Sequence, residues 1–191
     1  MYDEYVKLFE IARPFLDTRD NENHTRIAYE FAVRLLDEEG GDPDVILPAV
    51  ILHDVGWKCV PEDLQLTAFG PGKIDAALNR IHETEGARIA RELLEKVDYP
   101  APLIDEIAQI VEGHDSVKQP HSLNDAVVKD ADKLCRYTEI GFDTDSGRFG
   151  IEASDYLAIL SGLLDEWFHT PTAKRIAREE YGRRVRRQEG Q

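Results

Sequence analysis

The chain has 191 residues, of which 42% are hydrophobic and 32% are charged, and its formal net charge at pH 7 is −15. This length and composition are ordinary for one globular domain spanning residues 1–191. The acidic charge argues against a nucleic-acid-binding surface, which needs basic side chains to neutralise phosphates. No segment approaches the roughly 20 apolar residues of a membrane span. We therefore expect neither nucleic acid nor a membrane as a partner.

The N-terminal segment MYDEYVKLFEIARPFL is acidic and amphipathic. It lacks the basic-then-apolar order of a secretory signal peptide. The two cysteines, Cys59 and Cys135, are too few for a disulfide framework, and we interpret both as small core residues. These features predict a cytoplasmic protein.

Apolar residues recur with a helical period along nearly the whole chain. The expected helices cover residues 3–16, 24–39, 44–55, 83–97, 102–113, 124–140, 154–168 and 171–187. The segment 56–72 is rich in glycine and proline and is expected to be a loop, and FDTDSGRFG at 142–150 is expected to be a turn. No segment alternates with period two for long, and no linker divides the chain. The pattern predicts a single all-α bundle with a C-terminal helical extension at about residues 154–187.

The last expected helix reverses the acidic trend of the chain. Between residues 174 and 187 it carries one lysine and six arginines. We interpret this stretch as a solvated helix with a basic end, and a regulatory or RNA-binding tail is the alternative.

The most informative feature is the doublet His53-Asp54 in the run AVILHDVGWK. An apolar segment delivers an imidazole and a carboxylate side by side, at the end of a helix that we expect to be buried. Burying both groups without a partner is costly. A divalent metal relieves that cost, because neutral imidazole and carboxylate are its ordinary ligands. The alternative is a surface pair at a helix end.

Other residues of the metal-binding types recur at the expected helix ends. His24 opens the second expected helix, His82 immediately precedes the fourth, and His114 ends the fifth. Asp132 lies inside the sixth, which is otherwise apolar. Side chains from several helix ends can converge at one end of a bundle. Any one of these histidines could be a capping or core residue, but together with two aspartates they indicate a metal site.

The order H, HD, H, H, D resembles the HD-domain superfamily of metal-dependent phosphohydrolases. The resemblance covers about residues 20–140 and is carried by NHTRIA, LHDVG and DADKLCRY, the last of which is similar to the family's ADxL segment. That match places the ligand at Asp132 rather than at Asp130. His82 in IHETEGARIA and His114 in IVEGHD match the subset that holds two metals. The fold that the resemblance implies is an all-α HD-domain-like bundle.

The resemblance implies two divalent metal ions, of Fe, Mn, Zn, Co, Ni or Mg. One ion would take His24, His53, Asp54 and Asp132, and the second would take His82 and His114 and share Asp54. Two cations about 3.5–4 Å apart can clamp a phosphoryl group and lower the pKa of a bridging water. Asp54 and Lys58 are the catalytic candidates. The family often has a lysine directly after HDxG, and here Trp57 comes before Lys58.

Local cations are expected to hold the phosphate of a small anionic substrate. The candidates are Lys58, just after the doublet, Arg80, just before His82, and Lys133 and Arg136, close to Asp132. Arg136 is the best of them, because residues one helical turn apart share a face. Each of these cations could equally be an exposed solubilising charge.

Three function classes share these residues. The first is a hydrolase of phosphomonoesters or phosphodiesters, acting on nucleotides or related small metabolites through a metal-activated water. The second is a di-iron oxygenase of the HD fold that cleaves a C–C or C–P bond, because His and Asp ligands also suit iron. The third is a non-catalytic regulatory domain that a metal stabilises. We expect the first.

Overall fold

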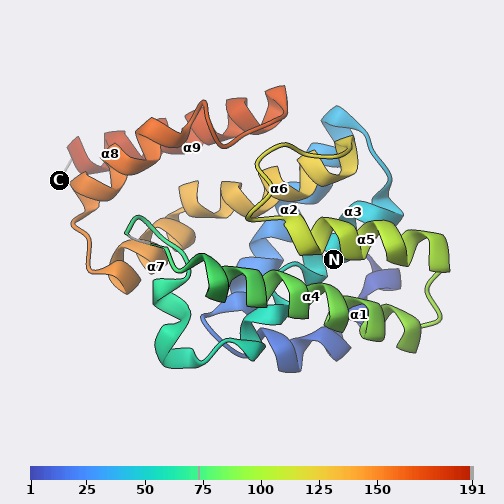
Figure 1. Cartoon of the computed structure of the whole chain (residues 1–191). Helices are drawn as coiled ribbons and strands as arrows, with labels where there is room; N and C mark the ends of the chain where they lie inside the picture. Colours follow the sequence, from blue (N-terminus) through green and yellow to red (C-terminus); the bar gives the residue numbers. More distant parts are fainter. Residues whose placement is uncertain (73, 190–191) are drawn as a thin grey trace.

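Helices make up the regular structure of the chain. The computed structural model describes residues 1–72 and 74–189, and no strand occurs within these ranges. The helices are α1 (Asp3–Leu16), α2 (Asn21–Glu39), α3 (Pro43–Leu52), the 3-10 helices η1 (Val55–Cys59) and η2 (Glu62–Thr67), α4 (Ala76–Lys96), α5 (Ala101–Gly113), α6 (Leu123–Leu134), the 3-10 helix η3 (Cys135–Tyr137), α7 (Glu139–Phe149), α8 (Ala153–Leu163) and α9 (Pro171–Glu189) (Figure 1). The predicted all-α class is confirmed. Within the described ranges, no helix combines the length and apolarity that crossing a membrane requires.

α3 lies at the centre of the bundle because it is apolar on every side. Every residue from Val45 to Leu52 is buried, and α3 contacts α1, α2, α5 and α6. Its first turn is fixed locally, because the Asp42 side chain accepts a hydrogen bond from the backbone N–H of Asp44. Pro43 suits the first position, because it has no N–H that would need an acceptor there. A helix of this composition is stable only when other helices surround it. α3 therefore carries the residue that follows it, His53, into the interior.

α4 and α5 form an antiparallel pair on the near face in Figure 1. α4 begins at Ala76, seven residues before the predicted start at 83, so that prediction is wrong. The reason is the cap: the Asp75 carboxylate accepts hydrogen bonds from the backbone N–H groups of Ala77 and Leu78, at 3.0 and 3.3 Å. The consequence is that His82 lies inside α4 instead of in front of it.

The segment FDTDSGRFG forms most of α7, and the predicted turn is wrong. The Thr138 side chain caps α7 by accepting from the backbone N–H of Gly141 at 3.1 Å. Gly150 ends the helix in the left-handed conformation, with φ 61°. Phe142 is buried, and Asp145 is buried and paired with arginines. These contacts outweigh the low helical propensity of the glycine, serine and aspartate residues.

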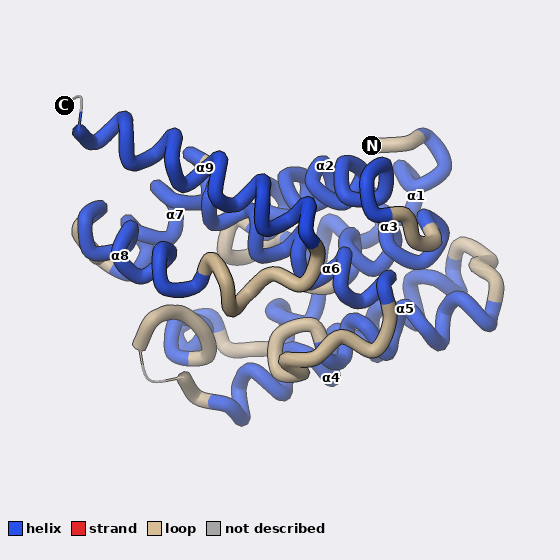
Figure 2. Tube along the Cα trace, turned by 90° about the horizontal axis from the view of Figure 1, so that it is seen from above, coloured by secondary structure: helices blue, strands red, loops and turns tan. Residues whose placement is uncertain are grey.

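The C-terminal helices pack onto the bundle. α9 contacts α2, α6 and α8, and seen from above it runs across the molecule (Figure 2). Its residues Ala173, Ile176 and Ala177 belong to the same cluster of buried apolar residues as α3. The hydrophobic core therefore extends from the first helices of the chain to the last.

A close backbone contact places η1 against α4. A Cβ atom added at Gly56 would lie 1.9 Å from the carbonyl oxygen of His82 and 2.5 Å from the backbone nitrogen of Gly86. Only glycine permits this approach. Since Asp54 immediately precedes η1, the contact brings its carboxylate next to α4.

Substitution of Gly56 tests this contact. We expect Gly56→Ala to lower the free energy of unfolding by about 1–3 kcal/mol or more, because backbone would have to move. Urea unfolding measures the change. Gly162→Ala in α8 is the matched control: nothing lies within 4 Å of its added Cβ, so stability should stay constant or rise by up to about 1 kcal/mol. Equal stability of the two variants would contradict the close contact.

Candidate metal centre

Two of the predicted ligands stand at helix C-termini. His53 follows α3 and His114 follows α5. In each ring Nδ1 lies close to the carbonyl oxygen three residues earlier, at 2.7 Å from Val50 and 2.8 Å from Val111. A carbonyl oxygen only accepts, so Nδ1 carries the proton and donates it. In the neutral ring Nε2 then has a free lone pair, as a metal ligand requires.

His24, His53 and Asp132 place three ligand atoms together. His24 Nε2 lies 3.0 Å from His53 Nε2 and 3.2 Å from Asp132 Oδ1, and His53 Nε2 lies 3.8 Å from the same oxygen. The three side chains come from α2, from the end of α3 and from α6, which contact one another. Separations of this size occur between ligands that each lie about 2.0–2.2 Å from one cation.

Asp54, His82 and His114 form a second group. Asp54 Oδ1 lies 3.6 Å from His82 Nε2 and 3.8 Å from His114 Nε2, and the two nitrogens are 3.3 Å apart. Trp57 fixes this group from one side, because its ring stacks on His82 with centroids 4.1 Å apart. The indole Nε1 of Trp57 also donates to Asp54 Oδ1 at 3.0 Å. The spacing again suits one cation.

The carboxylate of Asp54 lies between the two groups. Its Oδ2 is 3.7 Å from Nε2 of His24 and of His53. Its Oδ1 faces His82 and His114 at the distances given above. Each oxygen thus faces a different pair of histidines, which is the arrangement a bridging carboxylate needs. We call these six side chains the cage.

The ionisable groups of the cage shift one another's pKa values. Burial disfavours the ionised form of Asp54, but His53 and the other imidazoles outweigh it and hold the pKa of Asp54 well below its usual value. Burial and the neighbouring His114 lower the pKa of His82 to about 3. Burial also tends to lower the pKa of His114, but the carboxylates of Asp115 and Asp54 outweigh that effect and raise the pKa of His114 to about 9. Burial also opposes ionisation of Asp132, but a hydrogen bond from His24 and the charge of Lys133 outweigh it and hold the pKa of Asp132 well below its usual value. These two ionised carboxylates beside imidazole nitrogens fit divalent cations.

Asp115 is a second carboxylate at the second group, and sequence reasoning missed it. Its Oδ2 lies 3.7 Å from His114 Nε2 and 3.9 Å from His82 Nε2. The sequence does contain an indication of its role, because His114-Asp115 repeats the doublet His53-Asp54.

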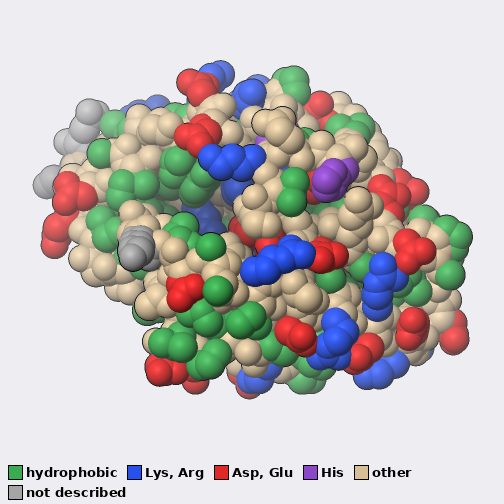
Figure 3. Space-filling model, viewed as in Figure 1, with side chains coloured by type: hydrophobic (Ala, Val, Ile, Leu, Met, Phe, Trp, Pro, Cys, Tyr) green, Lys and Arg blue, Asp and Glu red, His purple; other side chains and the backbone are tan. Residues whose placement is uncertain are grey.

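One cavity adjoins the cage and a second lies next to the first, and the face in Figure 3 is hollowed, with Lys and Arg side chains inside the hollow. The first cavity is lined by cage residues together with Arg19, Asp115, Arg136 and Arg148, among others. The second is lined largely by apolar side chains, including Phe149, Ile159, Leu163 and Trp167, with Lys133 and Arg136 among its polar residues. The cavities share Phe69, Asp115 and Arg136. They provide space for a polar and an apolar part of one ligand beside the cage.

Of the four cations predicted near the substrate, two lie at these cavities. Arg136 lines both, and its Nη1 lies 2.8 Å from Asp145 Oδ2. Lys133 lines the second cavity, with Nζ 3.6 Å from Asp132 Oδ2.

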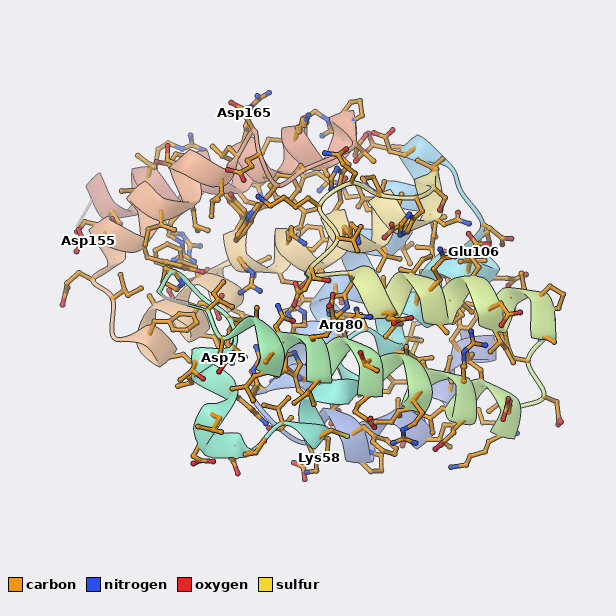
Figure 4. The ribbon with its side chains drawn as sticks, in the orientation of Figure 1. Lys58, Asp75, Arg80, Glu106, Asp155 and Asp165 are labelled. Atoms are coloured by element: carbon orange, nitrogen blue, oxygen red, sulfur yellow. The ribbon has the colours of Figure 1, made fainter. Side chains whose placement is uncertain are left out.

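The structure does not bring Lys58 or Arg80 to either cavity. Lys58 is exposed at the lower edge of the molecule in Figure 4 and donates to the carbonyl oxygen of Asp17 at 3.1 Å. Trp57 takes the inward position that directly follows HDxG, so the lysine turns outward. Arg80 lies on another face of α4 from His82 and donates to the carbonyl oxygen of Glu112 at 2.8 Å, toward the end of α5 (Figure 4). Their predicted roles at the site are not supported.

Sequence reasoning also missed Arg19 and Arg148, which line the first cavity. Arg148 stands in the segment that was predicted to be a turn. Arg19 lies outside every motif, five residues before His24, and only the folded chain shows that it faces the cage.

Comparison with known proteins gives the following findings. Residues 21–137, more than half of the chain, match the family model of the HD domain. The crystal structure at 1.45 Å resolution of a predicted HD superfamily hydrolase from an uncultured Thermotogales bacterium is similar in fold, with a TM-score of 0.64 and 20% sequence identity. The similarity covers 95% of this chain and 88% of that one. No curated protein matches the chain.

The two aspartates of the DAD segment should behave differently when substituted. Asp132 faces the cage, so Asp132→Asn should lower metal affinity at least about 100-fold. Asp130 accepts from the backbone N–H groups of His169 and Thr170, both at 2.8 Å, where α9 begins. Asp130→Asn should leave metal affinity nearly unchanged and lower the free energy of unfolding by about 1–3 kcal/mol. Calorimetric metal titration and urea unfolding measure both effects, and the reverse order of metal affinities would contradict the assignment.

Proposed function

The chain belongs to the HD domain family, and we propose that it is a metal-dependent phosphohydrolase acting on a small phosphorylated metabolite or a nucleotide. The observation that carries the proposal is the position of Asp54, whose two carboxylate oxygens face two separate pairs of histidines. Divalent cations held by the cage would lower the pKa of a water and neutralise charge on phosphoryl oxygens.

The protein's own groups prepare this site. The Trp57 indole donates to Asp54 and stacks on His82, so two cage residues are held in one orientation. The carbonyl oxygens of Val50 and Val111 fix the proton of His53 and His114 on Nδ1. Such groups around ligands align them before substrate arrives and reduce reorganisation during the reaction.

Cations beside the cage support an anionic substrate. Arg136 lies at the junction of the two cavities, and Lys133 lies at the wall of the apolar one. A phosphoryl group at the cage would meet Arg136, and the organic part of the ester would extend along Phe149 and Trp167. Apolar walls with few polar groups are typical of small-molecule sites.

The one cysteine at the cavity is a poor nucleophile. Cys135 lines the first cavity, but its Sγ donates toward the carbonyl oxygens of His24 and Ala131, both at 3.6 Å. Burial raises the pKa of this thiol, which keeps it protonated. This favours attack by water over a covalent cysteine intermediate.

Release of phosphate from a panel of nucleotides and p-nitrophenyl phosphate tests the proposal. We expect metal-dependent release by the wild-type protein, and a loss of at least about 100-fold in His53→Ala, because the cage loses a ligand. His121→Ala is the matched control, since His121 is exposed and outside the cage, and it should keep wild-type activity. Full activity of His53→Ala would contradict the proposal. Oxygen uptake by the iron-loaded protein without phosphate release would assign the oxygenase class instead.

A further inference from the structure

Arg19 packs against two aromatic rings beside the cage. Its guanidinium carbon is 3.9 Å from the ring centroid of Trp57 and 3.7 Å from that of Phe69. Trp57 and Phe69 belong to a small buried cluster of their own. Contacts with both rings restrict the orientation of the planar guanidinium.

The guanidinium has donors without acceptors. Arg19 Nε and Nη1 are buried, and no hydrogen-bond partner for either occurs among the described residues. Burial lowers the pKa of Arg19 to about 10, and Arg148 and Arg136 contribute in the same direction. The group remains charged at neutral pH. A buried charge with unpaired donors costs stability, so a protein keeps one where a ligand supplies the acceptors.

The backbone at Arg19 is strained as well. Arg19 and Asp20 follow one another in the left-handed region, with φ 54° and 60°. Neither is glycine, so both conformations are unfavourable. Arg148 Nη2 donates to the carbonyl oxygen of Arg19 at 2.5 Å and helps to hold the strained turn. Strain and an unpaired charge thus occur at the same residue.

The other two arginines of this cavity are already paired. Arg136 and Arg148 lie 2.8 and 3.0 Å from the two carboxylate oxygens of Asp145. Asp145 also accepts from the hydroxyl of Tyr156 at 3.0 Å. Asp145 therefore neutralises much of their charge, and Arg19 is the arginine of the three whose donors are free.

We propose that Arg19 is the anion-binding residue of the site, and that its guanidinium binds the phosphoryl oxygens of the substrate. The first cavity supports this placement, because Arg19 lines it together with the cage residues His24, Asp54 and Asp132. A planar guanidinium offers two parallel N–H donors to two phosphate oxygens, which gives both affinity and orientation. The inference rests on the proposed function, and it replaces Lys58 and Arg80 as the phosphate-binding groups.

Binding of inorganic phosphate to the metal-loaded protein tests the proposal. Isothermal titration calorimetry gives the dissociation constant, and elemental analysis of the same samples gives the metal content. We expect Arg19→Gln to weaken phosphate binding roughly 10-fold or more with unchanged metal content. Phosphate should also raise the melting temperature of the wild-type protein and not that of Arg19→Gln.

Arg26→Gln is the matched control. Arg26 also lies over an aromatic ring, 4.3 Å from the centroid of Phe9, but it pairs with Glu22 at 3.0 Å on the surface. It should bind phosphate as the wild type does. If Arg19→Gln does not fold, Arg19→Lys replaces it in the test. Lysine keeps the positive charge but lacks the planar guanidinium, so this variant should also bind phosphate more weakly than the wild type.

The outcomes separate this inference from the proposed function. Wild-type hydrolysis together with unchanged phosphate affinity in the Arg19 variants would overturn the inference and leave the hydrolase in place. Phosphate binding that depends on Arg19, in a protein that hydrolyses no ester, would support the inference and overturn the hydrolase. A wild-type protein that does not bind phosphate would overturn the inference, and the phosphate-release assay then decides the proposed function by itself.

Discussion

The burial of imidazole and carboxylate groups close together is the constraint on which the rest of the structure depends. His53, His82 and His114 are almost completely buried, and Asp54 and Asp132 nearly so. Bringing them together costs desolvation of every group, and the attraction between imidazoles and carboxylates offsets part of that cost. The fold does this with a few local devices. An apolar α3 carries its C-terminus into the interior, and Gly56 lets the next turn touch the backbone of α4. A cation would compensate the cost, so metal binding and folding are coupled in such a protein.

Part of the walls of the site comes from outside the segment that holds the cage. All six cage residues lie within the range that matches the HD domain, residues 21–137. Arg148, Phe149 and Trp167 lie beyond it, and Arg19 lies before it, yet all four line the cavities. The matched segment thus holds the candidate ligands together with Lys133 and Arg136, and the flanking segments add Arg19, Arg148 and apolar side chains to the cavity walls.

The sequence predicted what depends on periodicity and on spacing along the chain. It predicted the all-α class, and the structure brings the six candidate ligands together in two adjacent groups. It did not predict the helix at 139–149, because the burial of Phe142 and the pairing of Asp145 are tertiary contacts that local propensity does not contain. The same limit explains Lys58 and Arg19. Lys58 is close in sequence to a cage residue and still points outward, whereas Arg19 lies outside every motif and points toward the cage. The direction of a side chain therefore followed only from the fold.

The metal content of the purified protein tests the central claim most directly, namely that Asp54 joins two metal sites. Elemental analysis should give about two divalent ions per chain for the wild type. His82→Ala and His114→Ala should each retain about one ion, because His24, His53, Asp54 and Asp132 still form a complete site with four ligands. A wild-type protein that saturates at one ion, with the same content in both variants, would contradict the account.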